Sequence, residues 1–181
     1  GSGPVDCATA PFVFVGSPTP TVTGSVGNTF TFGKRLRLYA LVDFKHGNRL
    51  YNAVEELRCA AEIGIPFCDV NYNPAKYPIR YVAETNPVLA TNGVNDEFIQ
   101  DASFAKLREI SLTYALPERF IPGVNTASIT VAARELHTWT KYRGADPEVN
   151  INANAGVAGT YFEQGIIPPL SRFTASLNIT F

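Results

Sequence analysis

The sequence predicts an all-β fold in which antiparallel strands form part of a transmembrane up-and-down β-barrel. Three observations support this prediction: five segments alternate apolar and polar residues, short and long connections follow one another in turn, and aromatic residues gather at the strand ends. A period of two indicates a strand whose two faces meet different surroundings. The last segment, which ends on Phe181, alternates without an exception.

Five strands are predicted at residues 21–32, 35–45, 103–116, 126–139 and 171–181, with long loops at residues 46–102 and 140–170. In the first strand Val22 and Phe30 share a face, opposite Thr23 and Thr29. Gly33 and Lys34 then form a short turn, which predicts a hairpin. One short helix is expected around residues 53–61. Short turns on one side and long loops on the other are typical of an outer-membrane barrel, with about five of its strands in this chain.

The third predicted strand contains one irregularity. Ile110 and Tyr114 belong to its apolar face, but Lys106 and Arg108 follow in the same phase. Either a β-bulge intervenes, or the strand extends beyond the apolar zone.

Aromatic residues sort to the two ends of the predicted strands. With the short turns assigned to the periplasm, the girdle on that side consists of Phe30, Phe32, Tyr114 and Phe181. The girdle on the opposite side consists of Phe44, Trp139 and Phe173. Bacterial barrels carry such belts at both membrane interfaces. A soluble extracellular β-sandwich, as a glycan-binding or adhesion module, is the alternative, because alternation alone also permits two packed sheets.

Composition excludes several other classes of protein. A net charge of −1, from 15 basic and 16 acidic residues, gives no electrostatic footprint for nucleic acid. No apolar run reaches the roughly 18–20 residues of a transmembrane helix. We expect no enzyme activity, cofactor or metal site, because no nucleophile with a base is apparent and Asp146 with Glu148 lacks the spacing of a calcium loop.

The three cysteines leave two possibilities open. Cys59 and Cys68 could close a loop in an oxidising compartment, which would leave Cys7 free or paired outside the chain. Unpaired buried thiols are the alternative, because a count of cysteines does not fix connectivity.

Several segments, in order along the chain, resemble the C-terminal region of the SusC/RagA family of TonB-dependent outer-membrane transporters. They are Gly16 to Pro20, Asp43 to Asn52, Asp101 to Tyr114, Thr138 to Val149, and Arg172 to Phe181. Glu135 and His137 depart from the Asn and Phe that the family often has before its Thr-Trp-Thr segment. The resemblance implies that the protein is located in the bacterial outer membrane. It also implies that the protein imports oligosaccharides or peptides together with a SusD-like lipoprotein.

The resemblance also implies features outside this sequence. Family members begin with a TonB box, which contacts the TonB complex, and a plug domain, and their barrels have about 22 strands. We therefore expect the chain to be a fragment whose remaining barrel precedes Gly1, with outer-membrane lipid and the barrel assembly machinery as further partners.

Two sets of residues are candidates for specific roles. Outer-membrane barrels as a class end in a strand that the barrel assembly machinery recognises as a signal. The residues that fit this assembly signal are Phe173, Leu177, Ile179 and Phe181. Loop aromatics could stack on a sugar or a peptide, the candidates being Tyr142, Tyr161 and Phe162. Ordinary packing within the loops is the alternative for this second set.

Overall fold

The structure is a computed structural model, and it describes residue 11 and residues 13–59, 68–85, 96–117, 121, 123–148, 162–163 and 167–181. The chain divides into two compact units. The sheet unit consists of Thr21–His46, Ser103–Thr140 and Pro169–Phe181, and the loop unit consists of Gly1–Pro20, Gly47–Ala102 and Lys141–Pro168. Each unit is described by itself.

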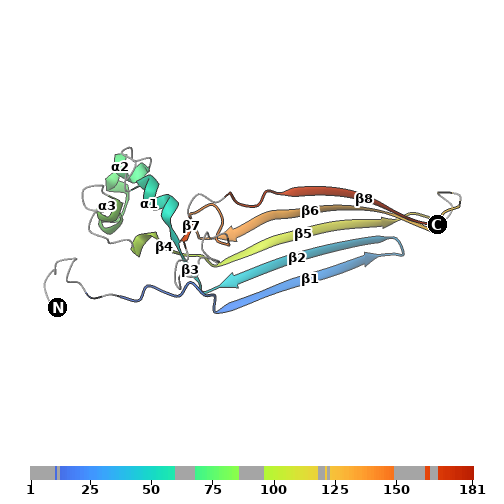
Figure 1. Cartoon of the computed structure of the whole chain (residues 1–181), viewed down its shortest axis with the longest axis horizontal. Helices are drawn as coiled ribbons and strands as arrows, with labels where there is room; N and C mark the ends of the chain where they lie inside the picture. Colours follow the sequence, from blue (N-terminus) through green and yellow to red (C-terminus); the bar gives the residue numbers. More distant parts are fainter. Residues whose placement is uncertain are drawn as a thin grey trace. The chain divides into compact units, whose positions relative to one another are not determined.

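The sheet unit is one open antiparallel sheet of five strands (Figure 1). Its strands, in their order across the sheet, are β1 (Val22–Phe32), β2 (Leu36–His46), β5 (Phe104–Ala115), β6 (Thr126–Thr140) and β8 (Arg172–Thr180). Each strand pairs with the strand of this unit that precedes it in the chain. This up-and-down order confirms the predicted fold class, and β1 and β8 form the two edges.

The predicted hairpin joins β1 to β2. The ladder runs without a shift from Val22 opposite His46 to Phe32 opposite Leu36. Gly33 in the turn has a φ of 61°. This left-handed conformation costs glycine little, so the residue type fits the turn.

The two faces of the sheet differ sharply in chemistry. One face carries large apolar side chains that remain accessible, with exposed fractions from 36% at Ile110 to 83% at Phe181. Its exposed members are Val22, Val26, Phe30, Phe32, Ile110, Leu112, Tyr114, Ile129, Val131, Trp139, Phe173, Leu177, Ile179 and Phe181. The other face carries threonine, serine and charged residues, as alternation requires.

Cross-strand rows locate the predicted aromatic girdles. Phe44 and Trp139 share one row through Ala105, and Phe32 and Tyr114 share another through Leu36. Phe173 lies at the start of β8 and pairs with Ala133 of β6. Ala133 is six residues away from Trp139 along β6.

A double bulge explains the change of phase in β5. Its register with β2 shifts between Leu41 and Val42, and its register with β6 shifts between Leu107 and Glu109. Glu135 on β6, next to this shift, has a φ of 53°. The bulge turns Lys106 and Arg108 to the polar face, so the first of the two explanations for the irregular strand is the one observed.

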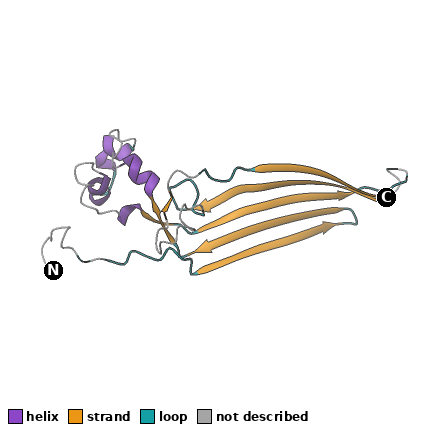
Figure 2. Ribbon diagram, viewed as in Figure 1, coloured by secondary structure: helices purple, strands orange, loops and turns teal. Residues whose placement is uncertain are grey.

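The loop unit contains regular structure inside both predicted long loops (Figure 2). Its small sheet has the order β4-β3-β7, with β3 (Arg49–Asn52) antiparallel to β4 (Ile99–Asp101) and parallel to β7 (Phe162–Glu163). The helices are α1 (Ala53–Cys59), α2 (Asp69–Tyr72), η2 (Pro74–Lys76), α3 (Ile79–Thr85) and η4 (Asp96–Phe98). The helix expected around residues 53–61 corresponds to α1.

No helix in the described part of the chain is both long enough and apolar enough to cross a membrane.

A small core and a disulfide hold the loop unit together. Leu50, Ala102 and Tyr142 form a buried cluster. Cys59 and Cys68 form a disulfide with a Cα–Cα distance of 5.0 Å, which joins the end of α1 to the start of α2. Of the two possibilities for the cysteines, the closed loop is therefore the one observed, and Cys7 lies outside the described residues.

Candidate functional site

A polar pocket in the loop unit begins at the first turn of α1. Asn52 precedes the helix, and its Oδ1 accepts a hydrogen bond from the backbone N–H of Glu55 at 2.9 Å. The Asn52 amide in turn donates to Glu55 Oε2 at 3.1 Å. Reciprocal bonds of this kind satisfy helix N-terminal donors and fix the carboxylate in place.

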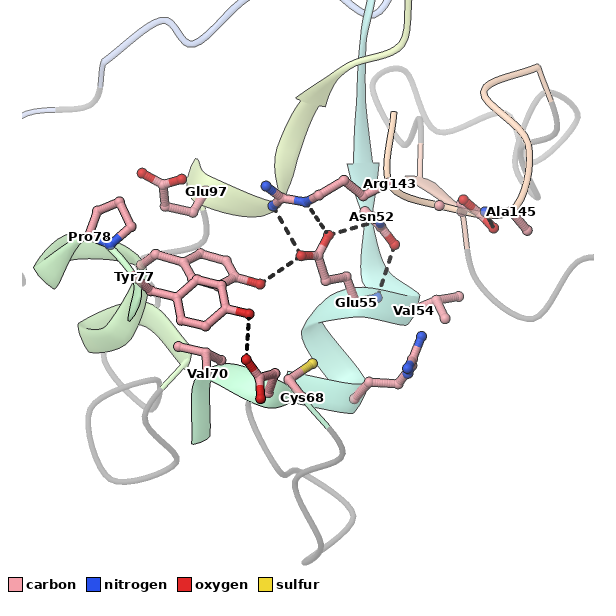
Figure 3. Close-up of a pocket in the computed structure, with 15 residues that line it drawn as sticks. Asn52, Val54, Glu55, Cys68, Val70, Tyr77, Pro78, Glu97, Arg143 and Ala145 are labelled. Carbon is pink, nitrogen blue, oxygen red and sulfur yellow. Dashed lines mark hydrogen bonds and ion pairs between the residues drawn. The ribbon is translucent and has the colours of Figure 1, made fainter. Parts of the chain in front are cut away.

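Glu55 joins three other segments of the loop unit. The Tyr81 hydroxyl donates to Glu55 Oε1 at 2.7 Å, and Gln100 Nε2 donates to Oε2. Arg143 adds a two-pronged ion pair (Figure 3), with Nη2 at 3.0 Å from Oε1 and Nε at 3.1 Å from Oε2. The Glu55 side chain is only 14% exposed, so its charge is balanced locally by Arg143.

Two tyrosines stand beside this ion pair. The rings of Tyr77 and Tyr81 are 5.6 Å apart and tilted by 38°. The Arg143 guanidinium lies 5.4 Å from the Tyr81 ring centroid, within the range of a cation–π interaction. Burial raises the pKa of Tyr81, and the hydrogen bond to Glu55 raises it further, because both disfavour the phenolate. Tyr81 is therefore a neutral donor at physiological pH.

Asp69, on α2, is the exposed acid at the rim of the pocket. Asn73 Nδ2 and the Tyr77 hydroxyl donate to its two carboxylate oxygens, the latter at 3.1 Å. Lys76 Nζ lies 3.6 Å from Oδ2. The bonds from Asn73 and Tyr77, followed by the charge of Lys76, hold the Asp69 pKa below its ordinary value of 3.8. Asp69 thus stays ionised over the physiological range.

The pocket encloses about 650 Å³. Its walls come from α1, α2, the start of α3, η4 and the segment around Arg143, and Cys68 of the disulfide also lines it. These elements are far apart in the sequence, and the bonded pair formed by Glu55 and Arg143 alone spans 88 residues. The volume falls within the range of small-molecule sites.

Tyr142, a predicted ligand contact, lies in the core of the loop unit with 5% of its surface exposed. Burial raises its pKa, and the neighbouring Glu163 carboxylate adds to the rise. This position favours the packing role over direct stacking on a ligand. Of the other two predicted ligand contacts, Phe162 belongs to β7 by its backbone, and its side chain is not described. Tyr161 lies outside the described residues.

The four candidates for an assembly signal share the apolar face of β8 and its end. Their exposed fractions are 72% for Phe173, 56% for Leu177, 38% for Ile179 and 83% for Phe181. Their common face follows from the register with β6, in which Phe173, Leu177 and Ile179 oppose Ala133, Ile129 and Ala127. The register thus places Phe173, Leu177 and Ile179 on one face, and their role in assembly stays a prediction.

A second cluster of charges lies on the polar face of the sheet unit, at the double bulge. Arg108 Nε donates to Asp43 at 2.7 Å, and its Nη1 donates to both Glu135 oxygens at 3.1 Å. Lys106, which is 2% exposed, has its Nζ 3.9 Å from Glu135 and 5.6 Å from the Phe104 ring centroid. The bulge therefore directs opposite charges toward one another on neighbouring strands.

Sequence reasoning did not identify Glu55 or Arg143 as site residues. The one local signal was the Asn-x-x-Glu spacing of Asn52 and Glu55, a variant of the capping box. It predicts a helix start but says nothing of the distant partners. Among the described residues, no group of three or more His, Cys, Asp or Glu is placed to hold a metal ion.

Comparison with proteins of known sequence finds two relatives that are named as TonB-dependent receptors. The chain is 31% identical over 105 residues to TonB-dependent receptor P3 of Formosa agariphila, and 26% identical over 91 residues to TonB-dependent receptor P26 of the same organism. These matches cover 52% and 48% of the chain but only 10% and 9% of the two receptors. The chain thus spans about a tenth of the length of these curated relatives. No protein-family description matches it.

Comparison with solved structures covers most of the chain. The RagAB peptide importer in its open-open state matches with a TM-score of 0.67 and 25% identity, over 92% of this chain and 18% of that one. A structure of the RagAB peptide transporter matches with a TM-score of 0.65 and 23% identity over the same shares. The resemblance predicted from the sequence is therefore confirmed: the chain is similar in sequence to part of two TonB-dependent receptors and similar in fold to part of RagA, a SusC-like TonB-dependent transporter.

Proposed function

We propose that the chain is the C-terminal barrel segment of a TonB-dependent importer in the bacterial outer membrane. The observation that carries the proposal is the one-sided sheet, whose apolar face leaves side chains such as Val26 and Leu177 more than half exposed. In water, an apolar surface of this extent is unfavourable. In a bilayer the same face meets hydrocarbon and the polar face lines the barrel interior.

The sheet edges support the same proposal. The sheet ends at β1 and at β8, and backbone groups on the outer sides of these strands have no ladder partner within the described sheet. Unpaired backbone groups are very costly in lipid. Further strands on both sides would close the barrel and satisfy them.

The soluble sandwich is the weaker alternative on these observations. It requires a second layer over the apolar face, and the described residues of the sheet unit form a single sheet. Relatives named as TonB-dependent receptors also favour the transporter.

We further propose that the importer carries oligosaccharides or peptides together with a SusD-like lipoprotein. Support comes from RagAB, which is a peptide importer of two components and shares the fold of this chain. Contact with the TonB complex would belong to a region outside this sequence.

A direct test uses the full-length protein that contains this chain. We expect it to fractionate with the outer membrane, to shift its gel mobility on heating as folded barrels do, and to retain a lipoprotein when purified in mild detergent. Recovery as a soluble protein with no detergent requirement would refute the membrane assignment. Growth of a deletion strain on peptides or on oligosaccharides as sole nutrient would separate the two classes of cargo.

The end of β8 has a proposed role in assembly. Deletion of Phe181 from the full-length protein should lower its amount in the outer membrane, because the assembly machinery would lose the exposed terminal ring of its signal. Deletion of Gly123, which lies in the turn between β5 and β6 and outside the signal, controls for a general effect of shortening the chain. Equal outer-membrane levels with and without Phe181 would contradict the signal.

A further inference from the structure

One buried carboxylate in the wall of the loop-unit pocket has no opposite charge beside it. Glu163, on β7, is only 2% exposed and lines the pocket together with Gly144 and Ala145. Its Oε1 accepts a hydrogen bond from the Ala145 backbone N–H at 3.0 Å. In the part of the chain that the structure describes, Oε2 has no hydrogen-bond partner, and no lysine or arginine forms an ion pair with Glu163. A buried charge without a counter-charge is costly, so this position favours a ligand that supplies one.

The uncompensated oxygen borders the pocket. A Cβ atom on Gly144 would clash with Glu163 Oε2 and with the Tyr142 ring, so the missing side chain of Gly144 leaves this oxygen its place in the wall. Tyr142 is neutral, because burial and then the Glu163 carboxylate raise its pKa. The neighbouring tyrosine therefore supplies no positive charge to Glu163.

The rest of the lining keeps the pocket negative. Its charged groups are four carboxylates and two guanidinium groups, which belong to Glu55, Asp69, Glu97, Glu163, Arg58 and Arg143. Arg143 pairs with Glu55 (Figure 3), and Lys76, which is outside the lining, pairs with Asp69. The other charges of the lining are two acids and one base, Arg58. The pocket therefore attracts a cation and repels an anion.

The tyrosines of the pocket favour an organic cation over a metal ion. Tyr77 and Tyr81 both line it, with their ring centroids 5.6 Å apart. The faces of such rings attract ammonium and guanidinium groups. Glu163 belongs to no cluster of three His, Cys, Asp or Glu side chains suited to a metal, as far as the described residues extend. An ammonium group, in contrast, pairs well with a single carboxylate.

We propose that this pocket binds a small molecule that carries a primary ammonium group, with the ammonium against Glu163. The ammonium would donate a charge-assisted hydrogen bond to Oε2 and give the buried carboxylate its counter-charge. The volume of about 650 Å³ is sufficient for a short alkylamine, whose chain can pack on the tyrosine rings. The inference goes beyond the proposed function, because it does not depend on the cargo that the importer carries.

The test is calorimetric titration of the purified full-length protein in detergent with butylamine and with putrescine. Butanol and butyrate are the matched neutral and anionic probes, and calcium chloride is the metal probe. We expect saturable binding of the amines that weakens as the salt concentration rises, because salt screens the attraction to the carboxylates. Butanol and butyrate should not bind.

Two substitutions should change the affinity in opposite directions. Glu163→Gln keeps the shape of the side chain and removes its charge, so amine binding should weaken by about tenfold or more, the equivalent of one charge-assisted hydrogen bond. Arg58→Gln removes the opposing base and should tighten binding by about two- to fivefold, the size of an interaction with an exposed charge. Because Arg58 is exposed, this second test stays valid if Glu163→Gln does not fold.

Glu56→Gln is the matched control for the loss of charge. Glu56 is an acid of α1 that does not line the pocket, so its replacement should leave the amine affinity unchanged. The native heat-dependent gel shift, together with native amide hydrogen exchange in α1, shows that a variant has folded.

The outcomes separate this inference from the proposed function. A folded outer-membrane protein that binds neither amine would overturn the pocket assignment and leave the importer intact. Calcium that binds more tightly than the amines and displaces them would also overturn it, as would an amine affinity that Glu163→Gln does not lower and Arg58→Gln does not raise. A full-length protein that never reaches the outer membrane would instead refute the proposed function, and the titration would still decide the pocket.

Discussion

The sheet unit and the loop unit are stabilised in opposite ways. In the sheet unit each strand pairs with its neighbour along the chain, and large apolar side chains remain on one open face. In the loop unit the apolar core is small, and polar contacts such as Glu55 with Arg143 join segments 88 residues apart. The comparison indicates that the sheet depends on what surrounds it, whereas the loop unit depends on its own internal contacts.

The two units should therefore respond to different perturbations. A change on the apolar face of the sheet acts through contact with lipid, and its size depends on depth in the bilayer. A change in the loop unit acts through a hydrogen-bond network or a cross-link, and the surrounding membrane has little part in it. Four substitution experiments test this contrast, starting from the largest expected effect.

The strongest test places arginine on adjacent residues of β1. Val26 is on the apolar face and 63% exposed, while Ser25 is exposed on the polar face. Val26→Arg should destabilise the full-length protein in lipid by about 2–4 kcal/mol, because it buries a charge in hydrocarbon. Ser25→Arg should have little effect, since it lies opposite Asp43. Denaturant unfolding in lipid vesicles measures both, and equal losses would contradict the assignment of the two faces.

The next test removes the cross-link of the loop unit. Replacing Cys59 and Cys68 together by serine opens a loop whose ends are nine residues apart in sequence. In the chain-entropy model of a disulfide, closing a loop of this length contributes about 2–3 kcal/mol. Hydrogen exchange should then quicken in α1 and α2 and stay unchanged in the five strands of the sheet unit. Faster exchange throughout both units would show that they do not respond separately.

A smaller effect is expected from neutralising the centre of the polar network. Glu55→Gln keeps the shape of the side chain but removes the charge that pairs with Arg143. We expect a loss of about 1–2 kcal/mol in the stability of the loop unit, because Arg143 is half exposed and solvent already weakens the pair.

Glu56→Gln is the matched control for this change, because Glu56 is adjacent on α1 and does not line the pocket. Amide hydrogen exchange near α1 should be faster in Glu55→Gln than in Glu56→Gln. If Glu56→Gln loosens α1 as much as Glu55→Gln does, the network around Glu55 is not what holds the helix.

The contrast between the units also explains what the sequence could predict. Alternation around residues such as Val26, Leu112 and Leu177 is a local signal that predicted the strands and their faces. The alternation of short and long connections predicted their up-and-down order. The bulge at Arg108 was foreseen only as one of two options, because a change of phase does not say whether the strand bends or leaves the apolar zone.

The loop unit lacked a comparable signal. Its strands have two to four residues, too few to show a period, and β3 pairs with segments about 50 and 110 residues further along the chain. Tyr142 illustrates this: the sequence left both ligand stacking and loop packing open for it, and in the structure it packs in the core with Leu50 and Ala102. Only tertiary contacts distinguish it from Tyr77, which lines the pocket.

The smallest effect concerns the ionisation of Asp69 at the rim of the pocket. Its pKa in the folded protein lies below the ordinary value of 3.8, so the stabilising contribution of its contacts is fully present above that value and is lost as the pH falls through the folded pKa. NMR of the side-chain carboxyl carbons in labelled protein should therefore show a lower pKa for Asp69 than for a free aspartate. Removing its partners should raise the pKa most for Asn73→Ala, less for Tyr77→Phe and least for Lys76→Ala, in the order of their contributions. If Asp69 titrates at its ordinary value in the native protein, its contacts with Asn73, Tyr77 and Lys76 contribute little, and the loop unit would depend on the network around Glu55, the disulfide and the small core.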